Sequence, residues 1–168
     1  MDEAEFADFA ASATPRLRNL ALALTGSRAD AEDLLQITFE QVFRAWGRAA
    51  PENPVAYARA TMTHRHISER RRARWRREHL SADVPDRSED AGDAGDGGDR
   101  TLLFNLLRRL PERQRQAVVL RYLEDLSVLE TAALMRCSTG NVTRLSHDAL
   151  RALRAGMTAM TNAIDEEA

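Results

Sequence analysis

The spacing of apolar residues near the C-terminus predicts two helices joined by a tight turn. Residues 127–154 read SVLETAALMRCSTGNVTRLSHDALRALR. In the second predicted helix the apolar side chains follow helical spacing and form one face: Val142, Leu145, Ala149, Leu150 and Leu153. The opposite face is polar. Short polar and basic side chains on a helix suit the base edges and phosphates of the DNA major groove, so the pattern predicts a helix-turn-helix that binds DNA.

An ordinary helical hairpin with a solvated outer face would show the same spacing, so this segment alone leaves two interpretations open. Ala132 and Val142 occupy the two positions where the helices are expected to pack most closely. The residues on the predicted polar face are Asn141, Thr143, Arg144, His147, Asp148 and Arg151. The rest of the chain decides between the interpretations.

The first 26 residues predict an apolar segment followed by a helix. Phe6 and Phe9 begin the apolar pattern, and Thr14 and Pro15 then resemble a helix cap followed by a first-turn proline. We therefore expect a helix that begins at Pro15 and is ended by Gly26. Its buried face carries Leu17, Leu20, Ala21 and Leu24.

Two more helices are predicted before residue 80. Ser27, followed three residues later by Asp30, resembles a capping box at the start of a long helix. The buried face of that helix carries Leu35, Phe39, Val42 and Trp46. Asn53 and Pro54 begin the next helix, which runs into the basic segment RRRARWRRE and is expected to project a dense positive surface.

The segment from 81 to 99, SADVPDRSEDAGDAGDGGD, separates these helices from the C-terminal ones. Its Gly, Ser, Pro and Asp content provides too little apolar surface for a core, so it is predicted to be a flexible acidic linker. An amphipathic helix stopped by Pro111 and a helix around 118–122 are predicted to follow. The apolar residues of the first are Leu102, Leu103, Leu106, Leu107 and Leu110.

Composition favours an all-α fold of one or two small domains, because the 168 residues contain few aromatics and many Ala, Leu and Arg. A net charge of −2 hides strong segregation. Residues 51–80 carry eight Arg and three acids, whereas residues 81–100 carry two Arg and seven acids. All 24 basic residues are arginine, which fits a GC-rich genome and supplies permanently charged phosphate ligands.

The sequence also predicts what the protein lacks. No apolar run approaches the roughly 18 to 20 residues that span a bilayer and no leader opens the chain, so we expect a cytoplasmic protein without membrane insertion. The one cysteine, Cys137, excludes an internal disulfide and a cysteine-rich zinc site. We find no phosphate-binding loop and no set of nucleophile, base and orienting residue, so we expect no enzyme, no metal and no cofactor.

Three segments in order resemble the extracytoplasmic-function sigma factors of the sigma-70 family. DAEDLLQ at 30–36 is similar to the helix that docks on the clamp helices of the largest RNA polymerase subunit. AYARATMTHRHISERRRAR at 56–74 is similar to the promoter-melting helix. LPERQRQAVVLRYLEDLSVLETAALMRCSTGNV at 110–142 resembles the domain that recognises the minus-thirty-five element. The resemblance extends over nearly the whole chain and implies an actinobacterial type.

For the first segment, the residue pattern agrees with a docking role. Acidic residues and Ile37 recur at helical spacing opposite the apolar face, which gives an acidic surface with an apolar centre suited to a basic helix. A solvated charged face is the alternative. The residues that pattern and resemblance assign to polymerase binding are Asp30, Glu32, Asp33, Leu34, Gln36, Ile37 and Glu40. Ile37 stands where the family usually has Glu.

For the second segment, the arginines are expected to neutralise phosphates, while neighbouring residues and the loop 47–53 receive a base extruded from the minus-ten element. The minus-ten residues that the resemblance implies are Asn53, Tyr57, Met62, Thr63, His64, Arg65, Arg70, Arg71 and Arg74. His64 stands where the family usually has Asn, so the identity of the captured base is open. The alternative is that His64 and His66 are ordinary residues of the helix surface.

For the third segment, the minus-thirty-five residues are Ser138, Thr139, Asn141, Thr143, Arg144, His147, Asp148 and Arg151. Basic groups common in the family are missing at 143, 145 and 148, which predicts weak binding or an unusual element. Asp148 is suited either to accept from a cytosine amino group or to repel ordinary promoters. Arg136 replaces the usual turn glycine, at a cost of ~1 kcal/mol if the backbone is left-handed.

The predicted organisation is a sigma2-like helical domain at 1–78, a linker at 79–100, a sigma4-like helix-turn-helix domain at 101–160 and an acidic tail at 161–168. The last four residues, 165–168, are expected to be frayed. The resemblance implies promoter DNA, the polymerase clamp helices and the flap of the second-largest subunit as partners, and an anti-sigma factor as a further one. It also implies that the linker threads toward the polymerase active-site cleft; a solubilising tether is the alternative.

The predicted function is therefore that of a sigma factor that directs core RNA polymerase to specific promoters. Two alternatives remain at this point. One is an autonomous helix-turn-helix regulator, although the chain lacks an obvious dimerisation helix. The other is a sigma-like module that docks on polymerase or a regulator without normal promoter reading.

Overall fold

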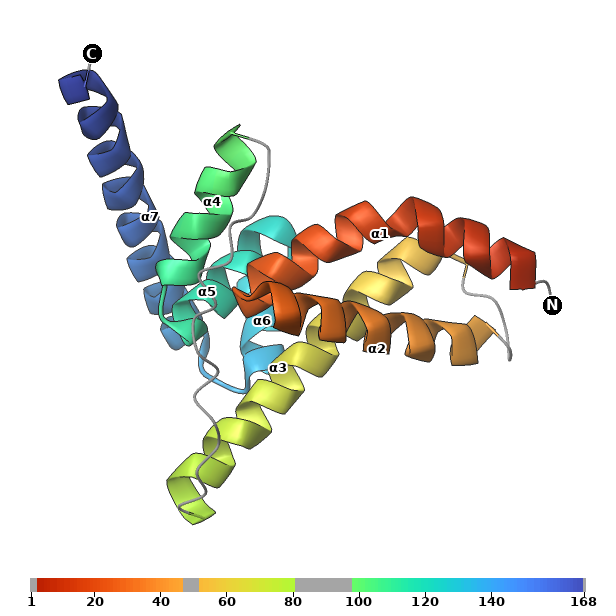
Figure 1. The fold of residues 1–168 in the computed structure, drawn as a ribbon. Coiled ribbons are helices and arrows are strands. Elements are labelled where there is room, and N and C mark those ends of the chain that lie inside the picture. The colour runs from red at the N-terminus through yellow and green to blue at the C-terminus, as the bar shows by residue number, and fades with distance from the viewer. Residues whose placement is uncertain (1–2, 47–51, 81–97, 168) are drawn as a thin grey trace. The chain divides into compact units, whose positions relative to one another are not determined.

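The computed structural model describes residues 3–46, 52–80 and 98–167, and every regular element in these ranges is a helix. The chain divides into two compact units, residues 1–92 and 93–168 (Figure 1). Each unit has its own core. The all-α, two-domain prediction is confirmed at this level.

The first unit packs three helices against one another: α1 (Glu3–Thr25), α2 (Arg28–Trp46) and α3 (Pro54–Leu80) (Figure 1). Each contacts both of the others. Its largest fully buried side chains come from all three helices: Leu17, Leu24, Val42, Thr38 and Met62. The C-terminal turns of α3 extend beyond α1 and α2, and these turns carry the basic segment.

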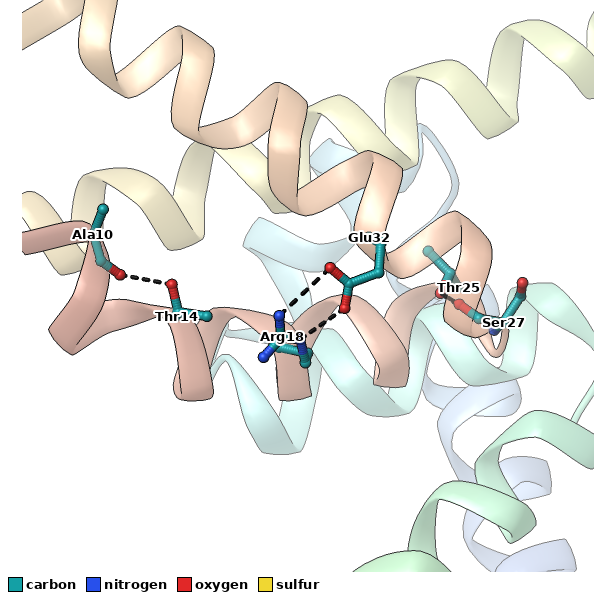
Figure 2. A network of polar contacts seen from close by, with 6 residues as sticks. All are labelled: Ala10, Thr14, Arg18, Thr25, Ser27 and Glu32. Carbon is teal, nitrogen blue, oxygen red and sulfur yellow. Dashed lines mark hydrogen bonds and ion pairs between the residues drawn. The ribbon is translucent and has the colours of Figure 1, made fainter. Parts of the chain in front are cut away.

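Helix α1 departs from the prediction, because it begins at Glu3 and runs through Pro15 instead of starting there. The Thr14 hydroxyl donates to the Ala10 carbonyl at 2.6 Å, as in a helix interior rather than at a cap (Figure 2). Proline costs one helical hydrogen bond. Aromatic packing offsets that cost, since Phe6 lies 4.9 to 6.4 Å, between ring centroids, from three rings of α2: Phe39, Phe43 and Trp46.

The predicted end of α1 and the predicted starts of α2 and α3 are confirmed. Gly26 has φ 68° and ends α1, a backbone conformation that glycine adopts without strain. The Ser27 hydroxyl accepts from Asp30 N at 3.3 Å at the start of α2. The Asn53 side chain accepts from Ala56 N at 3.0 Å, so Asn53 caps α3 and Pro54 takes the first helical position.

The second unit contains five helical elements. These are α4 (Gly98–Arg109), α5 (Glu112–Val118), the π-helix η1 (Val119–Leu123), α6 (Val128–Met135) and α7 (Thr139–Glu167). The predicted helix at 118–122 is thus the end of α5 continued as a π-helix. Helix α7 packs against α4, α5 and α6, and the shared core contains Leu106, Leu107, Leu120, Ala132, Val142 and Ala149.

The turn between α6 and α7 confirms the predicted helix-turn-helix. Ser127 and Glu130 form a full capping box at the start of α6, with Glu130 N to Ser127 Oγ at 3.0 Å and Ser127 N to Glu130 Oε2 at 2.7 Å. Helix α6 ends at Arg136, whose φ of 50° and ψ of 54° are left-handed. Arg136 therefore occupies a left-handed backbone position that glycine adopts with less strain.

Three boundaries differ from the prediction. Helix α3 continues to Leu80 and α4 begins at Gly98, so each enters the predicted linker by two or three residues. Helix α7 continues to Glu167, so residues 165–167 are helical rather than frayed. The remainder of the predicted linker, 81–97, lies outside the described residues. Within the described residues, none of the helices meets the length and hydropathy that a bilayer crossing requires.

Candidate nucleic-acid interface

Helix α2 presents the predicted acidic face on its outer side. Asp33, Gln36 and Glu40 are exposed, and Asp30 and Ile37 are half-buried. Three carboxylates therefore surround a partly accessible isoleucine, as the spacing predicted. Such a surface complements a basic helix with an apolar centre.

Glu32, the next predicted docking residue, is held by α1. Arg18 Nε donates to Glu32 Oε1 at 2.7 Å, and Arg18 Nη2 lies 3.5 Å from Oε2 (Figure 2). The hydrogen bond to Glu32 raises the pKa of Arg18. Both side chains are about half exposed, so the pair adds at most about 1 kcal/mol to stability. A partner that binds Glu32 must share the carboxylate with Arg18.

Leu34 lies elsewhere. Its side chain is 5% exposed and packs in the core of the first unit. A residue buried to this extent cannot contact a partner unless the helix moves. Leu34 therefore fixes α2 against its neighbours, beneath the acidic face, instead of forming part of that face.

A pocket of about 380 Å³ opens on the surface between α2 and α3. Its walls offer an aromatic ring, a carboxylate, an amide, hydroxyls and cationic groups: Gln41, Tyr57, Thr61, His64, Arg65, Ser68, Glu69 and Arg72. Arg65 Nη2 and Glu69 Oε1 form an ion pair at 2.8 Å. Arg65 Nε is buried and has no acceptor among the described residues. The neighbouring His66 is 7% exposed, so it is not the surface residue that the sequence allowed.

Three of the predicted minus-ten residues lie in this pocket, and others do not. Tyr57, which is 41% exposed, shares the pocket with His64 and Arg65. Met62 and Thr63 are 0% and 2% exposed and belong to the core, so neither can touch a base. The remaining positions are the helix cap Asn53 and the half-buried Arg70, Arg71 and Arg74, while the predicted loop residues 47–51 lie outside the described residues.

Four pocket residues were not predicted from the sequence: Gln41, Thr61, Ser68 and Glu69. On α3 the pocket residues recur every three or four positions, which marks one helix face: Tyr57, Thr61, His64, Ser68 and Arg72. Counting from Tyr57 in these steps finds Thr61 and Ser68, and Glu69 follows Arg65 by four residues. Gln41 comes from α2, and only the packing of the two helices brings it to the pocket.

The polar face of α7 is exposed and its side chains are tied to one another. Arg144 Nη2 donates to Asn141 Oδ1 at 2.8 Å, and Arg144 Nη1 lies 3.6 Å from Asp148 Oδ2. Arg151 Nη2 lies 3.4 Å from His147 Nε2. These contacts hold the basic groups over one face of the helix, and bound DNA would have to exchange with them.

The N-terminal turn of α7 contains the other predicted DNA-contacting residues. The Ser138 hydroxyl accepts from Asn141 N at 3.1 Å and therefore caps the helix. The Thr143 hydroxyl donates to the Thr139 carbonyl at 3.1 Å. Both hydroxyls therefore form local hydrogen bonds with the backbone at the start of α7. Thr139 itself is exposed at the first helical position.

Comparison with known proteins finds two family models in the order of the two units. Residues 10–76 match sigma-70 region 2, and residues 100–153 match sigma-70 region 4. The chain is 34% identical over 151 residues to an RNA polymerase sigma-E factor of Streptomyces avermitilis, across 89% of this chain and 83% of that protein.

Two further similarities are informative at different levels. The chain is 35% identical over 146 residues to the ECF RNA polymerase sigma factor SigE of Mycolicibacterium smegmatis, across 83% of this chain and 56% of that protein. Among solved structures, the sigma factor RpoE of Bartonella quintana, in complex with the anti-sigma factor NepR, superposes with a TM-score of 0.57 at 20% identity. That match covers 92% of this chain and 97% of the other, and it shows a shared fold.

Proposed function

Because the chain belongs to the sigma-70 family and is an RNA polymerase sigma factor of the extracytoplasmic-function type, we propose that the pocket between α2 and α3 captures an unpaired base of the promoter minus-ten element. A sigma factor is not an enzyme, and it binds core RNA polymerase and promoter DNA. The autonomous regulator is accordingly set aside.

The observation that supports this proposal is the chemistry of the pocket. Its volume of about 380 Å³ is within the range of small-molecule sites, and an exposed aromatic ring, Tyr57, lines it. Gln41 and the Arg65–Glu69 pair offer both donors and acceptors, which is what the Watson–Crick edge of an extruded base requires. Holding the base offsets the few kcal/mol that unpairing costs, so melting needs no covalent step.

The acidic face of α2 and the polar face of α7 also receive roles in this proposal, according to the order of the two sigma-70 regions along the chain. We propose that the α2 face around Asp33, Gln36 and Glu40 docks on the clamp helices of the largest polymerase subunit. The α7 face around Arg144 and Arg151 then contacts the minus-thirty-five element. In this arrangement the Asp148 carboxylate restrains the Arg144 guanidinium. Asp148 thereby weakens the contact of Arg144 with a DNA phosphate, and it does not itself contact a base.

Further partners are proposals of the same kind. Exposed apolar side chains on η1 and α6, namely Tyr122, Leu123 and Leu129, would suit the flap of the second-largest subunit. The solved relative from Bartonella quintana is in complex with an anti-sigma factor. We propose that a regulator of this class would inhibit this chain by covering the α2 face. Because the protein acts on polymerase, we propose a cytoplasmic location. The predicted course of the linker stays a proposal.

The test is run-off transcription with core RNA polymerase, this chain and sheared DNA of its source, followed by permanganate probing of melted thymines at the starts found. Tyr57→Ala should lower permanganate reactivity about tenfold, because one aromatic contact to a base is lost. Ala60→Ser, on an exposed part of α3 outside the pocket, is the matched control and should be unchanged.

Two results would contradict the proposal. Equal permanganate reactivity of Tyr57→Ala and the unaltered chain would remove the pocket from base capture. Co-elution with core polymerase without any transcription start would instead favour a sigma-like module that has lost promoter reading.

A further inference from the structure

An exposed aromatic pair lies near the end of α3, beyond the pocket. Trp75 is 53% exposed, and the rings of Trp75 and His79 stack with centroids 4.7 Å apart and planes 14° apart. His79 Nδ1 lies 3.0 Å from the Trp75 carbonyl oxygen, which fixes the imidazole over the helix. The other tryptophan of the chain, Trp46, is 7% exposed and packs in the aromatic cluster of α1 and α2.

The stack holds the indole in place without burying it. One face of the Trp75 ring is covered by His79, so the exposed area belongs to the rest of the ring. A large exposed apolar ring is costly to leave in water unless a partner covers it. Because its orientation is already restricted, a planar ligand could stack on it with little further loss of side-chain entropy.

The charges around the pair specify what kind of ligand fits. Residues 70–80 contain six arginines and one acid, Glu78. Arg72, Arg76 and Arg77, which flank the pair, are exposed. A planar ring among arginines is the arrangement that binds single-stranded nucleic acid, in which the bases stack and the phosphates are neutralised.

The pair lies on the same face of α3 as the pocket. The spacing of Tyr57, His64 and Ser68 continues through Arg72, which lines the pocket, to Trp75 and His79 at steps of three or four residues. From Arg65 to Trp75 the helix rises about 15 Å. At the B-form spacing of about 3.4 Å per nucleotide this distance corresponds to at most about five nucleotides, and fewer if the strand is stretched.

We propose that Trp75 and His79 form a second binding site for single-stranded DNA, at which an unpaired base stacks on the open side of the indole while Arg72, Arg76 and Arg77 hold the flanking phosphates. This inference rests on the proposed function only in one respect, namely that the strand runs along α3 from the pocket to Trp75. The stacking itself is a property of the free chain and is tested there.

The test uses tryptophan emission of the full chain carrying Trp46→Phe, in which Trp75 is the one remaining tryptophan. Trp46 Nε1 has no acceptor among the described residues, so phenylalanine removes no hydrogen bond that these residues provide. The probes are a thymidine 12-mer and an abasic 12-mer with the same phosphate backbone. We expect the thymidine strand to quench Trp75 and to bind about tenfold more tightly than the abasic strand.

Variants separate stacking from charge when binding is followed by anisotropy of a labelled strand. Trp75→Leu should weaken binding of the thymidine strand about tenfold and leave the abasic strand unaffected, and Trp75→Phe should retain most of the affinity. Arg76→Gln should weaken both strands equally, because a phosphate contact does not depend on the base. Circular dichroism of each variant checks that α3 is intact.

Several outcomes would overturn the inference. Equal affinity for the two strands, or no quenching of Trp75, would mean that no base stacks there. Quenching by poly-glutamate as strong as that by the thymidine strand would assign the surface to an acidic protein instead. If Tyr57→Ala abolishes promoter melting while Trp75→Leu leaves strand affinity unchanged, the proposed function stands and this second site does not.

Discussion

At the scale of single residues, Arg136 shows how a local backbone requirement limits the stability of the helix-turn-helix. Its left-handed φ of 50° places Cβ close to a backbone oxygen, a strain that glycine avoids. The Arg136 and Cys137 amides nevertheless reach the carbonyls of Ala133 and Ala132, at 3.4 and 3.1 Å, so the end of α6 is satisfied. The turn therefore forms despite the backbone strain at Arg136.

We therefore predict that Arg136→Gly stabilises the second unit by about 1 kcal/mol, as measured by urea unfolding. The matched control is Arg154→Gly, which makes the same replacement at an exposed position inside α7. That variant should lose about 1 kcal/mol, because glycine weakens a helix interior. A loss of stability in Arg136→Gly would show that the arginine side chain stabilises the turn by more than the strain costs.

Glu130 gives a pH-dependent contribution at the other end of α6. Hydrogen bonds from the Ser127 backbone amide and then the Ser127 side chain hold the pKa of Glu130 below its ordinary value of 4.5. A carboxyl group with a lowered folded-state pKa stabilises the fold above its unfolded-state pKa. This contribution is lost as the pH falls through the folded-state pKa.

We accordingly predict that the difference in unfolding free energy between the unaltered chain and Glu130→Gln is constant above about pH 5 and shrinks as the pH falls below about 4.5. Glutamine keeps an acceptor for Ser127 but does not titrate. Thermal or urea unfolding across pH 3 to 7 measures the difference. A difference that stays constant down to pH 3 would mean that the capping carboxylate does not contribute to the acid sensitivity.

Residue burial is where the sequence was least informative. The exposed positions of the α2 face could be predicted from helical spacing, because Asp33, Gln36 and Glu40 lie opposite the apolar stripe. Motif similarity, by contrast, gives a role to a segment and does not tell which side chains point inward. Met62 and Thr63 were therefore included among the base-contacting residues although both are buried.

At the scale of elements, helix ends were predictable wherever a local hydrogen bond determines them. Gly26, Ser27 and Asn53 act within a few residues of their own position, and each forms the contact that its sequence context predicts. The start of α1 depends instead on rings more than 30 residues away in sequence. No local pattern around Pro15 could reveal that this packing carries the helix through the proline.

Helices α4 and α7 meet at a glycine, and this contact can be tested. A Cβ atom at Gly156 would lie 2.5 Å from Cδ2 of the buried Leu106, so the side chain of Leu106 must shift if any residue other than glycine stands there. A Cβ atom at Gly140, in the first turn of α7, would meet only the Ser138 hydroxyl at 4.0 Å.

Comparing Gly156→Ala with Gly140→Ala separates packing from helix propensity. Both replacements favour the helix, and only the one at 156 crowds Leu106. We predict that Gly156→Ala is less stable than Gly140→Ala by about 1 to 2 kcal/mol in urea unfolding. Equal stabilities would show that Leu106 rearranges without cost and that α4 is not held closely at this point.

At the scale of the whole molecule, the order of the two sigma-70 regions could be predicted, whereas the pocket could be predicted only in part. Apolar periodicity and the acidic segment divide the chain into two helical units, and their order matches the two sigma-70 models. The pocket combines Gln41 of α2 with residues of α3, an arrangement that depends on how the two helices pack. Tertiary packing of this kind leaves no spacing signal in one sequence.

The surfaces proposed for polymerase docking and for strand binding lie on different helices of the first unit, so the two activities should be separable. The proposed docking face is on α2, whereas Trp75 and its neighbouring arginines are on α3. Replacing Asp33 and Gln36 together with Ala removes one exposed charge and one exposed amide without touching the core. We therefore expect the double variant to keep the unfolding free energy and the strand affinity of the unaltered chain.

The same variant should lose association with core polymerase by at least about tenfold, because contacts at the centre of an interface contribute most of the binding energy. Gel filtration with core enzyme measures this loss, and Asp8→Ala on the exposed side of α1 is the control for a change of charge alone. Retained association of the double variant, with Asp8→Ala also unchanged, would move the docking surface away from α2. Loss of strand affinity in the double variant would instead show that the two activities share one surface, in which case binding of polymerase and DNA would compete on the free chain rather than add.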